Sequence, residues 1–241
     1  MRPFGRTPLV IGHRGMAGFP ESSVAAFRAA IDAGADAVEV DVRRTRDGSL
    51  VVHHDERLPS GRRVRDCTLA DVRAELDAIP CLSDVAELAA GAGVGLQLDP
   101  KDVGGEVAAV DAALELLEQD RVIVTTSEDS SIRRLKAERP PISVGLTLGR
   151  AWPSPTQLFP WWRWRRCGAD FLSVRHRIAV AGVFLEARAM GASVLVWDVD
   201  RPGVLERVMG WGGLEGVITD HPDRAVAWRR GGPEAPRPSH R

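Results

Sequence analysis

The stretch AVEVDV at residues 37–42 lies between IGHRG at 11–15 and LVVHHD at 50–55. Glu39 and Asp41 are two residues apart in a predicted strand, and side chains in a strand alternate between its two faces. Both carboxylates therefore point the same way, among valines, where an unpaired carboxylate is costly. A cation is needed to compensate the pair. The two residues are thus candidate metal ligands.

A hairpin is predicted directly after this strand. Residues 47–48 read Asp-Gly, which is the strongest short signal for a two-residue hairpin turn. With that turn, the register places His54 directly across from Asp41 on one face of the sheet. The adjacent His53 would point to the opposite face, so it is left out of the candidate site.

The composition limits the class of protein. The chain has 241 residues, is 44% hydrophobic and carries a net charge of -1, which suits one large α/β domain or two small ones and gives no whole-chain electrostatic case for nucleic-acid binding. Cys67, Cys81 and Cys167 are widely spaced and are expected to be reduced thiols. No apolar stretch is long enough to span a membrane, and no signal peptide precedes the first strand, so we expect a soluble, cytoplasmic protein.

Short β-branched runs alternate with helical stretches along the chain, which is typical of a parallel sheet built from βα units. Eight such runs lie at residues 8–12, 37–42, 94–99, 121–125, 142–147, 169–174, 193–198 and 215–219. Eight parallel strands and eight helices in about 250 residues predict a TIM (β/α)8 barrel. The first expected helix carries Val24, Phe27 and Ile31 on its apolar face. A doubly wound open sheet is the alternative, because strand order cannot be read from one sequence.

The same pattern predicts the domain organisation. Residues 1–230 are expected to form a single barrel domain with a small insertion after the second strand, at about 56–80. The insertion contains a helix that Thr68 can cap. Residues 231–241 are rich in Pro, Gly and Arg, and we expect them to form a disordered tail.

In a TIM barrel, residues at the carboxyl ends of the strands line the active site. The residues predicted at those ends are His13, Arg14, Glu39, Asp41, Asp99, Lys101, Trp197 and Asp220. Asp99 is the natural third oxygen ligand, and a carboxylate set without thiolates favours Mg²⁺ or Ca²⁺. Arg14 and Lys101 can bind a phosphate group. His13 and His54 beside a cation favour phosphoester cleavage, in which one histidine takes a proton and the other gives one.

These residues occur in an order that resembles the glycerophosphodiester phosphodiesterases. The matching stretches are IGHRG at 11–15, PESS at 20–23, GADAVEVDV at 34–42, TRDGSLVVHHD at 45–55, LDPK at 98–101, VLVWDVD at 194–200 and GVITDHPD at 216–223. By this resemblance, the metal ligands are Glu39, Asp41 and Asp99, the acid–base pair is His13 and His54, and the phosphate contacts are Arg14 and Lys101. It also implies that Glu21 lines the site, and we expect Trp197 to contact the substrate.

The resemblance implies a metal-dependent phosphodiesterase that uses one divalent cation, Mg²⁺ or Ca²⁺. Its small-molecule substrate would be a glycerophosphodiester, whose own glycerol hydroxyl attacks phosphorus before the cyclic phosphate is hydrolysed. The expected products are glycerol 3-phosphate and an alcohol such as choline or ethanolamine. The chain departs from the family pattern at Ser22, usually Asn, at Asp99, usually Glu, and in VTTSED at 124–129, which lacks the usual aromatic residue.

Two alternatives remain at the level of sequence. The segment AWPSPTQLFPWWRWRR at 151–166 concentrates four of the seven tryptophans with three arginines, and a helix of this kind can lie at a lipid interface, where the enzyme would act on lysophospholipids. We favour a helix that packs its tryptophans on the barrel. The other alternative is a non-catalytic phosphate-binding barrel, against which His13 and His54 argue. The sequence leaves the alcohol, the metal and the oligomeric state open.

Overall fold

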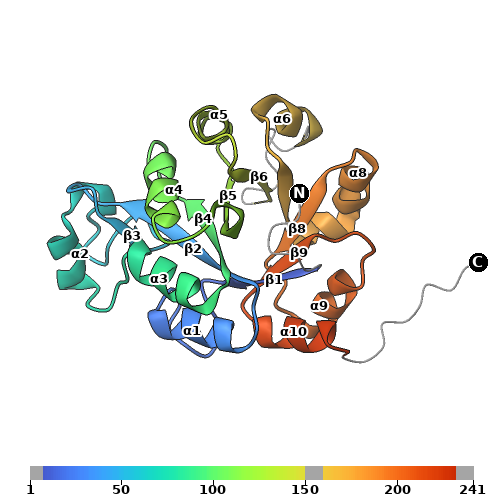
Figure 1. The fold of residues 1–241 in the computed structure, drawn as a ribbon, viewed down its shortest axis with the longest axis horizontal. Helices are drawn as coiled ribbons and strands as arrows, with labels where there is room; N and C mark the ends of the chain where they lie inside the picture. Colours follow the sequence, from blue (N-terminus) through green and yellow to red (C-terminus); the bar gives the residue numbers. More distant parts are fainter. Residues whose placement is uncertain (1–7, 150–159, 232–241) are drawn as a thin grey trace, which may run out of the picture.

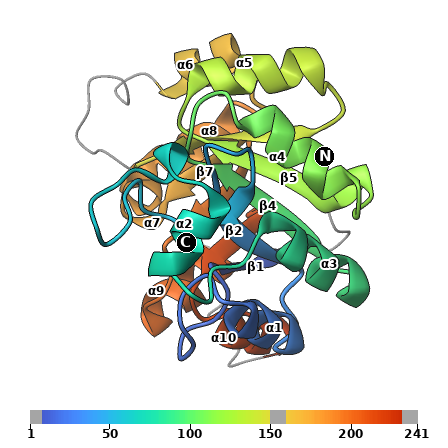
Figure 2. The ribbon, with the colours of Figure 1, turned by 90° about the vertical axis from the view of Figure 1, so that its left-hand side faces the viewer.

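The computed structural model describes residues 8–149 and 160–231. Its main feature is a closed barrel of eight parallel strands, with the helices packed around it (Figures 1 and 2). The barrel strands are β1 (Leu9–His13), β2 (Ala37–Arg44), β4 (Gly95–Pro100), β5 (Val122–Thr126), β6 (Ser143–Leu148), β7 (Phe171–Arg175), β8 (Ser193–Trp197) and β9 (Gly216–Thr219). Because β1 pairs with both β2 and β9, the sheet has no open edge within the barrel.

The helices follow the strands along the chain. They are α1 (Val24–Asp32), α2 (Leu69–Glu75), α3 (Leu82–Ala92), α4 (Glu106–Leu114), α5 (Asp129–Glu138), α6 (Pro160–Cys167), α7 (His176–Ile178), α8 (Phe184–Ala189), α9 (Pro202–Met209) and α10 (Pro222–Arg229). Short 3₁₀ turns lie at η1 (Val64–Asp66) and η2 (Gln119–Arg121), and a π-helical turn lies at η4 (Ala179–Val183). Each predicted strand run overlaps one barrel strand, so the TIM-barrel prediction is confirmed and the open-sheet alternative is wrong.

The barrel interior is apolar toward the amino ends of the strands, and we call this part the lower layer. The upper layer lies above it, toward the carboxyl ends. The inward-facing residues of the lower layer are Ile11, Ala37, Ile123, Phe171, Leu195 and Ile218. The ring of Phe171 fills the space beside Gly145, where an added Cβ would lie 2.2 Å from the ring. Only glycine fits there. The larger apolar core lies between the strands and the surrounding helices and contains Phe27, Leu96, Val144 and Val194.

Helix α1 shows one error in the predicted core. Ser23 caps the helix by accepting a hydrogen bond from the Ala26 amide, and Phe27 is fully buried, as its spacing predicts. Val24, however, is 37% exposed. It is the first residue of the helix, and the buried face is formed by Ala26, Phe27 and Ala30.

The predicted hairpin exists, but its register differs by one residue. Strand β3 (Leu50–Val52) pairs antiparallel with β2, and Arg44 faces Leu50 rather than Val51. The loop therefore has three residues rather than two, with Gly48 in the left-handed conformation at φ 89°. This is the three-residue hairpin loop that competes with the two-residue turn. The Asp41 carbonyl consequently accepts a hydrogen bond from the amide of His53, and not of His54.

The insertion after β3 has a small core of its own. Its buried residues are Val51, Leu58, Val64, Cys67, Val72 and Ile79. Helix α2 lies outside the ring of barrel helices, at the left of Figure 1, and begins with a capping box formed by Thr68 and Asp71. The predicted tail at 231–241 lies, apart from residue 231, outside the described residues, and the 1–230 domain boundary stays a prediction.

The three cysteines are free, as predicted. Within residues 8–149 and 160–231, no helix combines the length and the apolar character needed to cross a membrane.

Candidate active site

A cavity of about 310 Å³ opens at the carboxyl ends of the barrel strands. Its lining residues are His13, Arg14, Glu39, Asp41, His54, Gln97, Asp99, Lys101, Thr125, Thr147, Ser173, Arg175, Trp197 and Ile218. Eight of the nine residues predicted from sequence are among them. The exception is Glu21, which is largely exposed and reaches only the guanidinium of Arg14, at 3.1 Å.

Three buried carboxylates form one wall of this cavity. Strand pairing brings them together, because Asp41 faces Asp99 across the β2–β4 pair and Glu39 faces His13 across the β1–β2 pair. One oxygen from each of Glu39, Asp41 and Asp99 lies within 4.8 Å of the others. The three predicted ligands are thus within mutual reach of a single cation.

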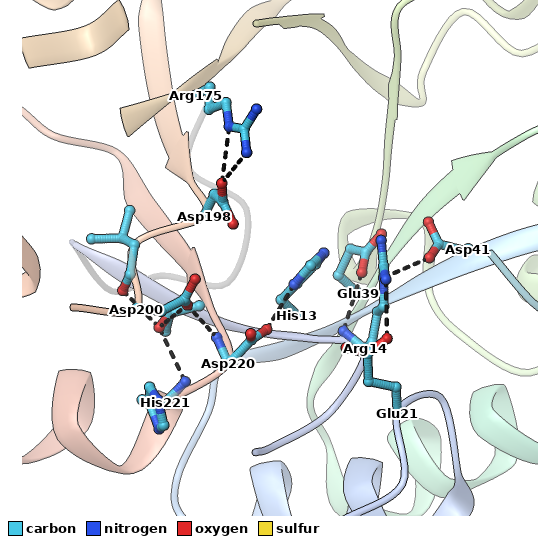
Figure 3. A network of polar contacts seen from close by, with 12 residues as sticks. His13, Arg14, Glu21, Glu39, Asp41, Arg175, Asp198, Asp200, Asp220 and His221 are labelled. Atoms are coloured by element: carbon cyan, nitrogen blue, oxygen red, sulfur yellow. Dashed lines mark hydrogen bonds and ion pairs between the residues drawn. The ribbon is translucent and has the colours of Figure 1, made fainter. Parts of the chain in front are cut away.

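Two cationic side chains contact this acidic cluster, those of Arg14, which Figure 3 shows, and Lys101. The Nε atom of Arg14 lies 2.8 Å from Asp41, and the backbone amide of Arg14 donates to Glu39 at 3.2 Å. The ammonium of Lys101 contacts both Asp41 and Asp99. The three carboxylates of Glu39, Asp41 and Asp99 outnumber the two positive side chains of Arg14 and Lys101. The cluster therefore lacks one positive charge when all three carboxylates are ionised. A divalent cation would reverse this balance and suit a phosphodiester anion.

The acidic cluster perturbs the pKa values of its own members. Burial, together with the charge of Asp41, raises the pKa of Glu39 to about 7. Burial also acts to raise the pKa of Asp41, but Lys101 and Arg14 outweigh it and lower the value. Asp41 therefore stays ionised, whereas Glu39 is partly protonated near neutral pH in the ion-free protein.

His13 is held by a carboxylate that the sequence analysis placed at the rim without a role. Its Nδ1 atom is 2.7 Å from Asp220, at the end of β9 (Figure 3). The backbone amide of Asp220 in turn donates to Asp200 at 2.9 Å. Burial lowers the pKa of His13, but the hydrogen bond to Asp220 and the charge of Glu39 raise it, for a net rise to about 9. This arrangement leaves Nε2 of His13 as the atom available to a substrate.

His54 reaches the same cavity although the predicted register is wrong. It lies two residues after the end of β3, and its Nδ1 is 2.9 Å from Asp55, which again leaves Nε2 available. The buried Arg43 fixes the backbone at this point by donating from Nε and Nη2 to the His54 carbonyl, at 3.1 and 2.8 Å. The third donor of Arg43, Nη1, binds Asp102 at 2.9 Å. His53 is not among the lining residues, as predicted.

Trp197 and Arg175 form the wall opposite the carboxylates. The indole of Trp197 donates to the carbonyls of Leu148 and Ser173, at 3.2 and 3.3 Å. The guanidinium of Arg175 lies 5.2 Å from the centre of the indole ring and binds Asp198 at 2.7 Å. Arg175 was not predicted as a site residue, although its position at the carboxyl end of a predicted strand was a usable signal.

The tryptophan-rich segment is described only from residue 160 onward, so Trp152 lies outside the described residues. In α6, Trp161 and Trp164 pack against the barrel core, as favoured from the sequence. Trp162 is 59% exposed. The guanidinium carbon of Arg166 lies over its ring, 4.7 Å from the ring centre. Arg163 is turned toward α5, where it binds Asp129 at 2.6 Å.

A TIM barrel whose strand ends carry three carboxylates, two histidines and two cationic side chains is an arrangement suited to a hydrolase that acts on phosphoesters. Comparison with known proteins gives the particular family. The family model described as "Glycerophosphoryl diester phosphodiesterase family" matches residues 13–224. The chain belongs to this family and is a phosphoric diester hydrolase. The non-catalytic alternative is thereby set aside.

Relatives of known name cover nearly the whole chain. It is 31% identical to the glycerophosphodiester phosphodiesterase of Caldanaerobacter subterraneus subsp. tengcongensis, over 93% of this chain and 99% of that one. A solved glycerophosphodiester phosphodiesterase from Thermotoga maritima has a TM-score of 0.71 at 25% identity, covering 92% and 98% of the two chains. An Oleispira antarctica phosphodiesterase, solved in complex with its product sn-glycerol-3-phosphate, has a TM-score of 0.75 at 24% identity, covering 93% and 97%.

Proposed function

We propose that this protein hydrolyses glycerophosphodiesters to glycerol 3-phosphate and an alcohol, with His13 and His54 as the acid–base pair and one divalent cation as cofactor. The observation that carries the proposal is the convergence of three carboxylates and two histidines on one cavity. The glycerol 3-phosphate bound by the Oleispira antarctica phosphodiesterase supports the substrate class.

The residues present fit a hard divalent cation. Glu39, Asp41 and Asp99 are buried, offer only oxygen atoms, and cluster within 4.8 Å. Oxygen ligands of this kind favour Mg²⁺ or Ca²⁺ over softer metals. A bound divalent cation supplies Lewis-acid stabilisation of the negative charge that develops on the phosphoryl oxygens.

The cationic side chains bind and orient the phosphodiester. Arg14 and Lys101 lie at the same wall as the carboxylates, and their positive charge can stabilise the phosphoryl oxygens. The left-handed conformation of Arg14, at φ 50°, turns its amide toward Glu39. Gly15 then packs so closely on α1 that an added Cβ would lie 2.5 Å from Ala26. This tight turn holds Arg14 at the cavity.

The two histidines move the protons. Each has its Nδ1 bound by a carboxylate, Asp220 for His13 and Asp55 for His54, so each presents Nε2 for proton transfer. One Nε2 takes the proton of the attacking glycerol hydroxyl, and the other gives a proton to the leaving alcohol oxygen. The roles exchange when water opens the cyclic phosphate.

The test is to incubate the purified protein with glycerophosphocholine and follow the release of glycerol 3-phosphate and choline. We expect turnover with Mg²⁺ or Ca²⁺, loss of turnover with a chelator, and recovery when the cation is restored. The variants His13→Ala and His54→Ala should each lose about 10²–10⁴-fold in kcat. A folded protein that turns over no glycerophosphodiester with any divalent cation would contradict the proposal.

A further inference from the structure

The upper layer of the barrel interior is polar where barrels ordinarily carry branched apolar side chains. On four consecutive strands, β4 to β7, the inward residues of this layer carry neutral hydroxyl or amide groups. They are Gln97, Thr125, Thr147 and Ser173. All four are at least 95% buried and line the same cavity as the carboxylates. We call them the neutral layer.

The neutral layer is not satisfied by its own hydrogen bonds. Gln97 donates from Nε2 to the hydroxyl of Thr125 at 2.9 Å. The Oε1 atom of Gln97 and the hydroxyl of Thr147 have no hydrogen-bond partner among the described residues. A buried polar atom without a partner costs about 1–3 kcal/mol. Groups left in this state at the wall of a cavity are suited to a polar ligand that completes them.

The neutral layer lies next to the reacting groups. Gln97 is two residues before Asp99 on β4, so both side chains face inward, with Gln97 one level deeper. The four side chains carry no charge, and they therefore suit hydroxyl groups rather than a phosphate or an ammonium. The attacking glycerol hydroxyl and the leaving alcohol lie on opposite sides of phosphorus, so only one of these two groups can extend inward. The neutral layer suits the glycerol, because the choline or ethanolamine of the leaving alcohol carries a charge.

We propose that the neutral layer binds the terminal hydroxyl of the substrate's glycerol and thereby selects glycerophosphodiesters over 1-acyl lysophospholipids. This inference rests on the proposed function. An acyl group on that oxygen would remove its donor and leave the groups of Gln97 and Thr147 buried without partners. The neutral layer is therefore a specificity-determining subsite that decides between the two substrate classes left open by the sequence.

The decisive variant is Thr147→Val, which removes the unpartnered hydroxyl and keeps the shape of the side chain. Because no hydrogen bond is lost in the free protein, thermal unfolding should occur at the same temperature or slightly higher. The substrates are glycerophosphocholine and its analogue that lacks only the terminal hydroxyl, the phosphocholine ester of propane-1,2-diol. The analogue keeps the hydroxyl that attacks phosphorus.

We expect the wild-type protein to prefer glycerophosphocholine in kcat/KM by about 10- to 100-fold. Thr147→Val should reduce this preference to about threefold or less, by lowering activity only on glycerophosphocholine. Gln97→Leu should act in the same direction. The matched control is Thr126→Val. The Thr126 side chain does not line the cavity, and its hydroxyl accepts a hydrogen bond from the Glu128 backbone amide. This variant should keep the wild-type preference.

Four results would overturn the inference while leaving the proposed function intact. The first is a wild-type protein that turns over both substrates equally. The second is a Thr147→Val variant that loses activity equally on both. The third is turnover of 1-acyl lysophosphatidylcholine as fast as glycerophosphocholine. A change confined to the preference between glycerophosphoinositol and glycerophosphocholine would assign the layer to the leaving alcohol and also overturn it. Failure of the wild type on every diester instead refutes the proposed function.

Discussion

At the scale of single residues, Asp220 has the clearest role that the sequence analysis did not assign. It binds Nδ1 of His13 at 2.7 Å and so fixes which nitrogen faces the substrate. A histidine backed by a carboxylate is the usual arrangement of an acid–base pair that must keep one tautomer. Asp200 supports it by accepting the hydrogen bond of the Asp220 amide.

We predict that Asp220→Asn lowers kcat by about 10²–10⁴-fold, because the amide neither stabilises the protonated imidazole nor enforces the same tautomer. Steady-state kinetics on glycerophosphocholine would measure the loss, and cation affinity should stay within about twofold because no metal ligand changes. Asp223→Asn, an exposed neighbour in the first turn of α10, is the control. Wild-type kcat in Asp220→Asn would show that His13 does not depend on this carboxylate.

At the scale of elements, the hairpin and the loop after β4 are joined by one side chain. Arg43 is 8% exposed and binds both the His54 carbonyl and the Asp102 carboxylate. Asp102 directly follows Lys101, whose ammonium lies on the acidic cluster. The position of His54 relative to that cluster therefore depends on Arg43.

We predict that Arg43→Gln lowers kcat by about tenfold and the free energy of unfolding by about 2 kcal/mol, because the His54 carbonyl and Asp102 lose charged hydrogen bonds. If Arg43 acts through His54, the loss of kcat should disappear in a His54→Ala background. Urea unfolding and kinetics of the two single variants and the double variant measure this. The exposed Arg44→Gln is the control. An equal loss in both backgrounds would contradict a positioning role.

The insertion helix should affect stability and not catalysis. The Thr68 hydroxyl accepts a hydrogen bond from the Asp71 backbone amide, and the Asp71 carboxylate accepts one from the Thr68 backbone amide. The two bonds together form a complete capping box. We predict that Thr68→Ala costs about 1 kcal/mol in urea unfolding, with kcat/KM unchanged, and that Thr68→Ser retains most of the stability. A large change in kcat/KM would indicate that the insertion shapes the cavity.

At the scale of the whole molecule, the proposed cation site predicts that metal binding depends on pH. Glu39 has a pKa raised to about 7 by burial and by Asp41, and a cation requires its ionised form. Affinity for Mg²⁺ or Ca²⁺ should therefore fall as pH decreases below about 7, by up to about tenfold per unit, and level off above about 8. The cation-bound protein should also unfold at a higher temperature.

Calorimetric titrations of the metal-free protein at pH 6 and pH 8, each in two buffers of different ionisation enthalpy, would measure the affinity and the protons released. We expect close to one proton released at pH 6 and few at pH 8. Glu39→Gln is the control, since it should bind more weakly and lose most of the pH dependence. Equal affinity at the two pH values in the wild type would contradict a raised pKa at Glu39.

The barrel and most of the residues that line its cavity could be predicted from the sequence alone. Alternation of apolar runs and helices is a local pattern, and a parallel sheet buried on both faces requires such runs. The i, i+2 spacing of Glu39 and Asp41 likewise fixes a common face whatever the rest of the chain does. His13, Asp99 and Lys101 follow because the carboxyl ends of parallel strands meet at one end of a barrel.

The pairing of these groups depends on the tertiary structure and could not be predicted from the sequence. The hairpin register depends on whether the loop has two or three residues, and the Asp-Gly dipeptide is compatible with both. The bond between His13 and Asp220 joins residues 207 positions apart, and it exists because β1 closes the barrel against β9. The neutral layer forms in the same way, since no local signal relates Gln97 to Thr147 before the strands are placed side by side.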